Sequence, residues 1–243
     1  MRKNLSIYFA MLLAGLVSVA CIIAVPEKIY GSSLPDTQPV TYTNTIQIHE
    51  DMPVFTAQLD MWQKPASAEN LYEYEASITI TDEYGEVLQY ITDLEISYRK
   101  DFRTDSRVIL IDPANPANFH FADYNNDGFL DMAVRQATDG TRINDPHYFW
   151  LWDAKLQQFE RSYELEELSG ASPLSLSHDG NVRTFLRHTL EHYVWETHKF
   201  VDGVLVPYIT RERKPIQVGE DSTYKTIITN HINETKSIML EPF

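Results

Sequence analysis

The segment Asp123–Asp131 reads D-Y-N-N-D-G-F-L-D and carries oxygen-bearing groups at alternate positions of a short loop. Alternate residues of a tightly wound loop face one centre, so they can offer oxygen atoms to a hard cation such as Ca²⁺. The predicted ligands are the side chains of Asp123, Asn125, Asp127 and Asp131 (the last directly or through water) and the backbone carbonyl of Phe129. Gly128 permits the sharp turn that such a loop needs. The alternative is a hairpin turn rich in Asp, Asn and Gly that binds no ion.

The residues around this loop decide which kind of calcium site it can form. An EF-hand places a bidentate Glu at the twelfth loop position and lies between two helices. The twelfth position here is Val134, and the flanking segments Phe119–Ala122 and Met132–Val134 have the composition of strands. The loop is therefore predicted to lie between two strands. A Ca²⁺ ligated by the protein there would stabilise the fold and would take no part in a reaction.

A second motif, His188-Thr-Leu-Glu-His192, has the spacing of the inverted zincin signature, in which two histidines one helical turn apart bind Zn²⁺. The segment that follows, Tyr193–Phe200, is strand-like, so the pattern predicts a strand in which the two imidazoles lie about 13 Å apart. The sequence contains no G-x-S-x-G elbow, no P-loop and no G-x-G-x-x-G motif. We therefore expect a protein that is not an enzyme.

The elements that must position the calcium loop follow a period of two, which is typical of β-strands. Tyr72–Ile80 and Val87–Thr92 are predicted to form a hairpin around Gly85, and Asp202-Gly203 is a dipeptide favoured in two-residue hairpin turns. Further strands are predicted at Arg107–Ile111, Asp131–Arg135, His147–Trp152, Gln158–Arg161, Val194–Val201, Val204–Ile209 and Tyr224–Ile232. One short helix is predicted at Tyr163–Leu168, and surface loops are predicted at residues 139–146 and 213–222. The expected fold is all-β and antiparallel, either a sandwich or propeller-like.

The N-terminus carries a targeting segment. Arg2 and Lys3 precede an apolar run from Leu5 to Val25, which is long enough for a signal peptide or for an uncleaved N-terminal anchor. Residues 1–25 are assigned to this segment, residues 26–39 to a linker, and residues 40–243 to a single β domain. Both interpretations of the N-terminus predict export, so we expect the β domain to be periplasmic, exposed on the cell surface or secreted.

Cys21 is the only cysteine of the chain, so no disulfide can form within one molecule. The stretch Ser18-Val-Ala-Cys21 resembles a bacterial lipobox, in which a lipid is attached to the cysteine, although Ser18 stands where an aliphatic residue is expected. Ser18 and Ala20 also fit the small-x-small rule for ordinary signal-peptide cleavage. The sequence leaves three fates of the N-terminus open: cleavage, lipidation at Cys21, or retention as a membrane anchor.

Residues 26–243 contain 18 basic and 35 acidic residues, a formal charge of −17. An acidic surface of this size disfavours nucleic acid and anionic lipid headgroups, which are themselves negatively charged. It favours cations and a basic protein partner. The sequence thus predicts a protein partner and no nucleic acid, with membrane contact only through the N-terminus.

Three stretches, in this order, resemble a family of exported bacterial proteins. They are the hairpin Glu75–Gln89, the loop Asp123–Asp131, and the segment Tyr148–Arg161 with its pattern Y-x-W-x-x-D-x-x-x-x-x-F. The combination is similar to the FG-GAP/VCBS-like proteins, many of which are lipoproteins, over roughly residues 70–210. The resemblance implies an all-β, calcium-bearing binding protein. Some members are related to periplasmic lysozyme inhibitors, and at least one is an immunity protein against a lysozyme-like toxin.

Together these features give one leading hypothesis and two alternatives. We expect a non-enzymatic, calcium-binding protein of the bacterial cell envelope that acts as a protein-binding module. The first alternative is an inhibitor or immunity protein against a lysozyme-like cell-wall hydrolase, a class of partner that is often basic. The second is an envelope-associated hydrolase with a pair of carboxylates, which would have to lie roughly 5 to 10 Å apart in a cleft.

Overall fold

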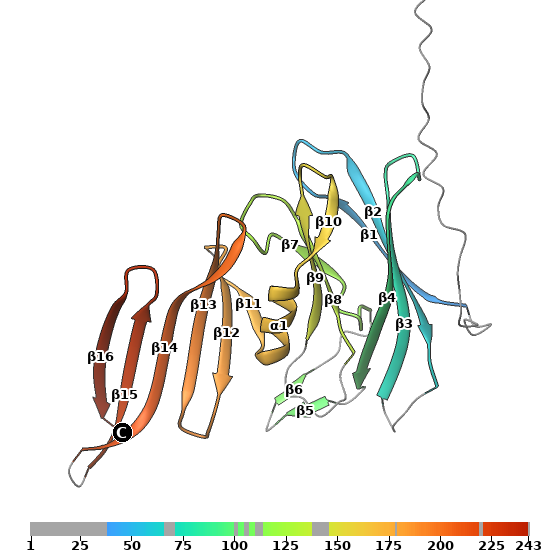
Figure 1. The fold of residues 1–243 in the computed structure, drawn as a ribbon. Helices are drawn as coiled ribbons and strands as arrows, with labels where there is room; N and C mark the ends of the chain where they lie inside the picture. The colour runs from blue at the N-terminus through green and yellow to red at the C-terminus, as the bar shows by residue number, and fades with distance from the viewer. Residues whose placement is uncertain are drawn as a thin grey trace, which may run out of the picture. The chain divides into compact units, whose positions relative to one another are not determined.

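The computed structural model describes residues 38–65, 71–99, 102–104, 107–109, 114–137, 146–177, 179–218 and 221–242 (Figure 1). All of these residues belong to one compact unit, Leu34–Phe243. The expected signal peptide or anchor, the lipobox at Cys21 and most of the expected linker lie outside the described residues. Within the part of the chain that the structure describes, no helix has both the length and the apolar composition needed to cross a membrane.

The fold is all-β and antiparallel with one short helix, as the alternating sequence pattern predicts. The first sheet has the order β1-β2-β3-β4, formed by Val40–Gln47, Val54–Gln63, Leu71–Thr81 and Val87–Arg99. The β3–β4 hairpin turns at Gly85, whose φ of 85° lies in the left-handed region, where glycine meets no steric penalty. Asp82 closes this turn, because its Oδ1 accepts from the backbone N–H groups of Tyr84 and Glu86.

The second sheet has the order β10-β9-β8-β7, formed by Gln158–Arg161, His147–Asp153, Asp131–Arg135 and His120–Ala122. Its central strands are buried on both faces. Along β8, Met132 packs into one hydrophobic core and Ala133 into another. Along β9, Trp150 packs into the same core as Met132, and Phe149 into the same core as Ala133. Both strands therefore read as nearly continuous apolar runs, without the alternation of a strand that has one face in water.

The first core lies between the first and second sheets, so these two sheets form a sandwich. The first sheet contributes fully buried side chains such as Leu59, Ile78 and Ile96. At one edge the two sheets are joined by Gln89 of β4, whose amide donates to Phe159 O at 2.8 Å and accepts from Phe159 N at 2.9 Å. The Gln89 side chain thereby forms with the backbone of the edge strand β10 the two hydrogen bonds that a neighbouring strand would form.

The second core lies on the opposite face of the second sheet and is closed by α1 and the beginning of a third sheet. The helix α1, Tyr163–Ala171, begins after Ser162, whose side chain accepts from the N–H of Leu165 as an N-cap. Leu165 is fully buried in the same cluster as Phe149 of β9.

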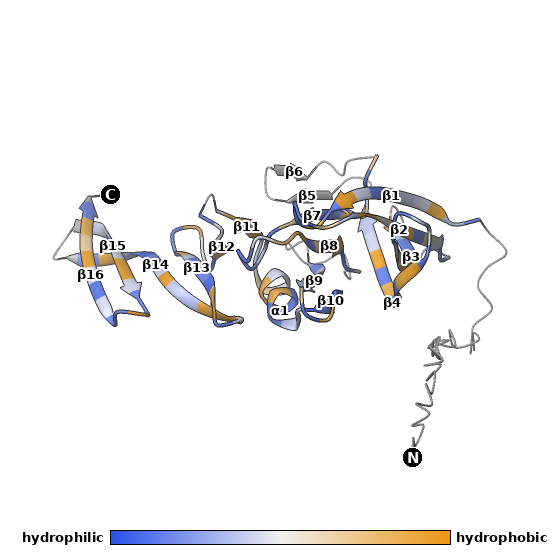
Figure 2. Cartoon of the chain, turned by 90° about the horizontal axis from the view of Figure 1, so that it is seen from above, coloured by the Kyte–Doolittle hydropathy of each residue, from blue (hydrophilic) through white to orange (hydrophobic). Residues whose placement is uncertain are grey.

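The third sheet has the order β11-β12-β13-β14-β15-β16, formed by Leu174–Leu176, Val182–Arg187, Tyr193–Val201, Val204–Val218, Asp221–Asn230 and Thr235–Pro242. It reaches the second core through residues such as Val182, Phe200 and Leu205. Among the described residues of β13 to β16, Thr226 is the only buried side chain. Hydrophobic and hydrophilic residues are mixed along these strands (Figure 2). Most of this sheet is therefore a single layer that meets solvent on both faces.

The remaining strands form a separate pair, β5 (Phe102–Thr104) with β6 (Arg107–Ile109), and β6 lies within the strand predicted at Arg107–Ile111. Several other predicted elements are confirmed: β8 and β10 have the predicted bounds, and the β13–β14 hairpin turns at Asp202 and Gly203 with φ of 52° and 80°, as a type I′ turn requires. The predicted loop at residues 213–222 is wrong, because β14 continues to Val218 and β15 begins at Asp221. The predicted loop at residues 139–146 lies almost wholly outside the described residues.

Candidate calcium loop and its surroundings

The loop Asp123–Asp131 joins β7 to β8 and is organised by its own polar side chains. Asp123 accepts from two backbone N–H groups, that of Asp127 at 3.1 Å and that of Gly128 at 3.0 Å. Asn125 Oδ1 also accepts from Asp127 N at 3.1 Å, and Asp127 Oδ1 accepts from Phe129 N at 2.9 Å. These contacts hold the side chains at the first, third and fifth positions of the motif next to one another.

Two residues give the loop its tight curvature. Asn126 has a φ of 58° and Gly128 a φ of 91°, both in the left-handed region. Glycine enters this region without a steric penalty, and asparagine enters it more readily than most other residues. The sharp turn predicted at Gly128 is therefore present.

Asp131, the last residue of the motif, is the first residue of β8 and is fully buried. Its Oδ2 accepts from Tyr124 N at 2.7 Å, and its Oδ1 accepts from Trp152 N at 2.9 Å. Burial raises the pKa of Asp131 to about 7, the two backbone hydrogen bonds oppose this rise, and the negative charges of Asp127 and Asp123 add to it. One buried carboxylate thus joins the start of the loop to β9, close to two other acidic side chains.

The donor chemistry of the loop fits a hard divalent cation. Its carboxylates, its amide oxygen and the carbonyl of Phe129 are ligands of the kind that Ca²⁺ prefers. Among the described residues, no Lys or Arg forms an ion pair with Asp123, Asp127 or Asp131. A cation held between these three carboxylates would offset their mutual repulsion, which adds to the effect of burial on the pKa of Asp131.

The loop also contacts the first sheet, at the turn between β1 and β2. Leu130 N donates to Ile48 O at 2.9 Å. The ring of Phe129 lies against the imidazole of His49, with 4.8 Å between the ring centroids. The loop is therefore attached to both sheets of the sandwich.

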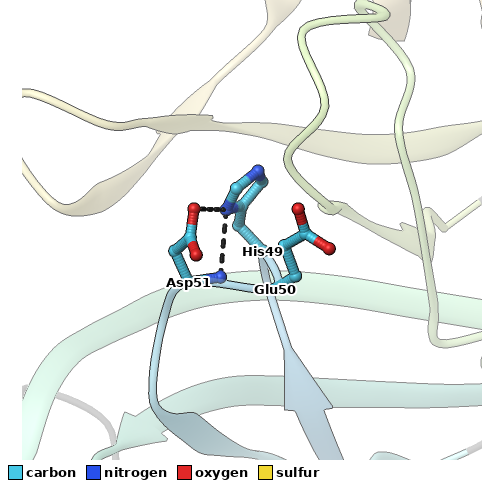
Figure 3. Close-up of side chains that lie close together, drawn as sticks. All are labelled: His49, Glu50 and Asp51. Atoms are coloured by element: carbon cyan, nitrogen blue, oxygen red, sulfur yellow. Dashed lines mark hydrogen bonds and ion pairs between the residues drawn. The ribbon is translucent and has the colours of Figure 1, made fainter.

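The same β1–β2 turn brings His49, Glu50 and Asp51 together, with one ligand atom of each within 4.8 Å of the others. Figure 3 shows the three side chains on the same side of the turn, with His49 Nδ1 3.7 Å from Asp51 Oδ2. The sequence prediction does not include this group. The run of three consecutive residues able to bind a metal, between two strands, could have indicated it. The Asp51 side chain is 87% exposed, and exposed acidic groups of this kind are common without a metal.

A segment of the third sheet also approaches the loop Asp123–Asp131. Gly180, in the turn between β11 and β12, has a φ of 73°, and a Cβ at this residue would clash with the side chain of Asn126. Glycine is therefore required here both by the backbone conformation and by the close approach. The loop thus contacts elements of all three large sheets.

A cavity of about 280 Å³ lies beside the loop, lined by Asn118, His120, Tyr124, His147, Phe149, Pro173 and Leu174. His120 Nδ1 lies 2.7 Å from Asn118 O, which assigns the proton of neutral His120 to Nδ1 and leaves Nε2 to accept from the Tyr124 hydroxyl at 2.5 Å. Asn118 Nδ2 donates to His147 Nε2 at 2.8 Å. The polar groups of this cavity are hydrogen bonded to one another, and no carboxylate lines it.

The structure corrects the expected position of the H-x-x-E-H motif. His188 and His192 lie in the turn between β12 and β13 and not along one strand, and their ring centroids are 4.7 Å apart. His188 N donates to His192 O at 3.0 Å and closes this turn, while His192 Nε2 lies 2.9 Å from Glu212 Oε1 of β14. The predicted separation of about 13 Å, derived from strand geometry, is wrong. The helix that a zincin site requires is absent from these described residues.

The fold and the loop together define an antiparallel β-sandwich extended by a single-layer sheet. No protein-family model matches the chain, and no curated protein matches it. Among solved structures, the chain is similar to the one described as "Structure of a Xanthomonas Type IV Secretion System related protein", with a TM-score of 0.54 and 9% sequence identity. The match covers 82% of this chain and 99% of that chain. At this identity the likeness shows a shared fold and nothing further.

Proposed function

We propose that this chain is a non-enzymatic protein-binding module of the bacterial cell envelope, stabilised by a structural calcium ion in the loop Asp123–Asp131. The observation that carries the proposal is the position of this loop. Its oxygen ligands lie on a segment that contacts β9, the β1–β2 turn and the β11–β12 turn. One ion bound there would hold three parts of the fold in place, which is a structural role and requires no reaction.

The envelope location is supported by the N-terminal apolar segment with its preceding Arg2 and Lys3. It is also supported by the resemblance of three stretches to the exported FG-GAP/VCBS-like family. The likeness of fold to a protein described as related to a type IV secretion system is compatible with a binding role in the envelope.

For the cavity beside the loop, the hydrogen bonds argue against an acid–base role of the residues that line it. A general acid or base needs a polar group that is available to the substrate. In this cavity the imidazoles of His120 and His147 are engaged by Asn118, and the Tyr124 hydroxyl is engaged by His120. The pair of carboxylates that a glycosidase requires is not part of its lining.

Calorimetric titration of the EDTA-treated and dialysed chain with Ca²⁺ tests the ion. We expect one class of site, no comparable heat with Mg²⁺, and loss of the heat in Asp127→Ala. Mg²⁺ should bind poorly because it demands a smaller, near-octahedral set of ligands. If Ca²⁺ produces no heat above that of dilution, the calcium part of the proposal is wrong.

Capture of partners from bacterial envelope extracts tests the binding role. The full chain is immobilised, and retained proteins are compared with those retained by the same chain after thermal unfolding. We expect a partner that is retained by the folded chain alone. If the folded and unfolded chains retain the same proteins, the binding role is contradicted.

The acidic character of the chain favours one more specific function, inhibition of a lysozyme-like cell-wall hydrolase. Such hydrolases are often basic, and the charge of −17 on residues 26–243 would attract them and accelerate association. An inhibitor should form an equimolar complex with a basic muramidase in size-exclusion chromatography and should abolish its activity on cell walls. A chain that leaves every tested muramidase active and unbound would exclude this function.

A further inference from the structure

The third sheet carries a face on which aromatic and arginine side chains are neighbours. Residues directly opposite each other in an antiparallel sheet lie on the same face. Trp195 of β13 is opposite Phe185 of β12 on one side and Arg211 of β14 on the other. Tyr193 is opposite Arg187 and Arg213 in the same way. With Tyr224 of β15, these residues form what we call the aromatic–arginine face: Phe185, Arg187, Tyr193, Trp195, Arg211, Arg213 and Tyr224.

This face points away from the hydrophobic core. Burial alternates along β12, where Val182 and Thr184 are buried while Phe185 and Arg187 are exposed. Val182 belongs to the second core, so the opposite side of β12 is the one that meets solvent. Phe185 is 38% exposed, which is unusual for a large apolar side chain in the middle of a sheet.

The three arginines of the face lie over aromatic rings. The guanidinium carbon of Arg211 lies 5.3 Å from the ring centroid of Trp195. That of Arg187 lies 5.9 Å from Tyr193, and that of Arg213 lies 3.8 Å from Tyr224. Arg187 Nε also donates to Thr189 O at 3.2 Å. A guanidinium stacked in this way can still offer its remaining N–H groups, and it loses less conformational entropy when it binds an anion.

The charge of this face is opposite to that of the chain. Arg213 Nε lies 3.4 Å from Glu241 Oε2, but Arg187 and Arg211 have no acidic partner among the described residues. The chain has 35 acidic and 20 basic residues, so an acidic partner for each arginine would be easy to supply. Two stacked arginines without a carboxylate therefore form a positive region on an acidic protein.

We propose that the aromatic–arginine face binds an extended acidic segment of a partner protein. One carboxylate can accept two parallel hydrogen bonds from one guanidinium. Alternate residues of an extended segment lie on one face at intervals of about 7 Å. Arg211 and Arg213 are alternate residues of β14 and have the same interval, so one acidic side chain of the segment can pair with Arg211 while the next on that face reaches Arg213 in place of Glu241.

Other anionic or aromatic-binding ligands fit this face less well. A long polyanion would extend beyond the face and meet the acidic remainder of a chain whose formal charge is −15. A sugar ring would stack on the faces of Trp195 and Tyr193, and arginines already lie over both rings. A protein segment with a few acidic residues would meet the arginines and avoid the acidic remainder.

A titration of the full chain with a fluorescent synthetic peptide, in which Glu alternates with Thr, tests the proposal. The variant Arg187→Gln with Arg211→Gln removes two positive charges from the face. The control variant Lys225→Gln with Lys236→Gln removes the same charge from the opposite face, since these lysines alternate with Thr226 and Ser237 along β15 and β16. We expect roughly tenfold weaker binding for the arginine variant, unchanged binding for the control, and weaker binding of the unaltered chain at high salt.

The proposal is overturned if the two double variants bind the peptide equally well, or if a peptide with Lys in place of Glu binds as tightly. It is also overturned if polyphosphate or an acidic polysaccharide binds more tightly than the peptide. None of the residues of the face belongs to the calcium loop, and the attraction of a basic hydrolase rests on the net charge of the chain and not on these residues. A negative peptide titration would therefore leave the proposals of calcium binding and partner capture untouched. Negative results for those two proposals would likewise leave the peptide titration informative.

Discussion

Replacing Asp123 by Ala should remove the response of the fold to calcium and should cost about 2 kcal/mol of stability without the ion. In the absence of calcium, the substitution removes two hydrogen bonds to exposed backbone N–H groups, those of Asp127 and Gly128. Bonds of this kind contribute about 1 kcal/mol each. In calcium at about 100 times its dissociation constant, binding stabilises the folded state by about 2.7 kcal/mol. The loss of a carboxylate ligand should remove most of that gain.

Asp153, the last residue of β9, provides a matched control. Its Oδ1 accepts from Lys155 N at 2.7 Å and from Leu156 N at 3.0 Å, so Asp153→Ala removes the same number of exposed hydrogen bonds and the same charge. Asp153 lies outside the calcium motif. The two variants should lose similar stability in EDTA, and only Asp153→Ala should recover stability when calcium is added.

Thermal unfolding followed by circular dichroism, in EDTA and in excess calcium, measures these effects. In a domain of this size, a gain of about 2.7 kcal/mol raises Tm by roughly 5 to 10 °C. The unaltered chain and Asp153→Ala should show this rise, whereas Asp123→Ala should not. If EDTA leaves the Tm of the unaltered chain unchanged, the calcium site is refuted. If Asp123→Ala responds to calcium as fully as Asp153→Ala, the assignment of Asp123 as a ligand is refuted.

Three further substitutions test the structure around the loop by urea unfolding. Asp131→Ala should destabilise the chain in EDTA by about 3 kcal/mol, because two buried N–H groups lose their acceptor; Asp131→Asn keeps one acceptor and should cost less, and equal costs would contradict this explanation. Gly180→Ala should cost about 1 kcal/mol more than Gly203→Ala, because both residues have positive φ but only Gly180 lies against Asn126; equal costs would mean that the asparagine moves aside freely. Gln89→Ala should cost about 2 kcal/mol, because its amide supplies two hydrogen bonds between β4 and β10; an unchanged urea midpoint would mean that water replaces them.

The sequence predicts those parts of the fold in which burial or turn chemistry leaves a local pattern. The alternation of Tyr72–Ile80 predicts most of β3, and Asp202-Gly203 predicts a turn that needs two residues with positive φ. The spacing of the calcium motif correctly places Gly128 at the tight turn. The strand β2 also has a clear signal that the prediction missed, since Phe55, Ala57, Leu59 and Met61 alternate with less buried residues.

Other features could not be predicted because they depend on contacts between distant residues. The strand β16 is exposed from Thr235 to Leu240, so burial gives it no alternating pattern, and only its pairing with β15 identifies it as a strand. The spacing of the motif does not predict the hydrogen bond from Trp152 N, near the C-terminal end of β9, to Asp131. The contact between Phe129 and His49 likewise joins segments that are far apart in the sequence.

The single-layer part of the third sheet has a consequence for how the molecule opens. Strands with no core beneath them are stabilised by their neighbours, so the sheet should fray from β16 inward, in the manner of a repeat array. Deuterium should therefore enter the amides of β15 and β16 by local opening, while those of β8 and β9, held between two cores, should exchange only when the whole domain unfolds. A ligand that bridges β12 to β15 would oppose this fraying. Slower exchange in β14 and β15 would then report occupancy of the aromatic–arginine face without any label on the ligand.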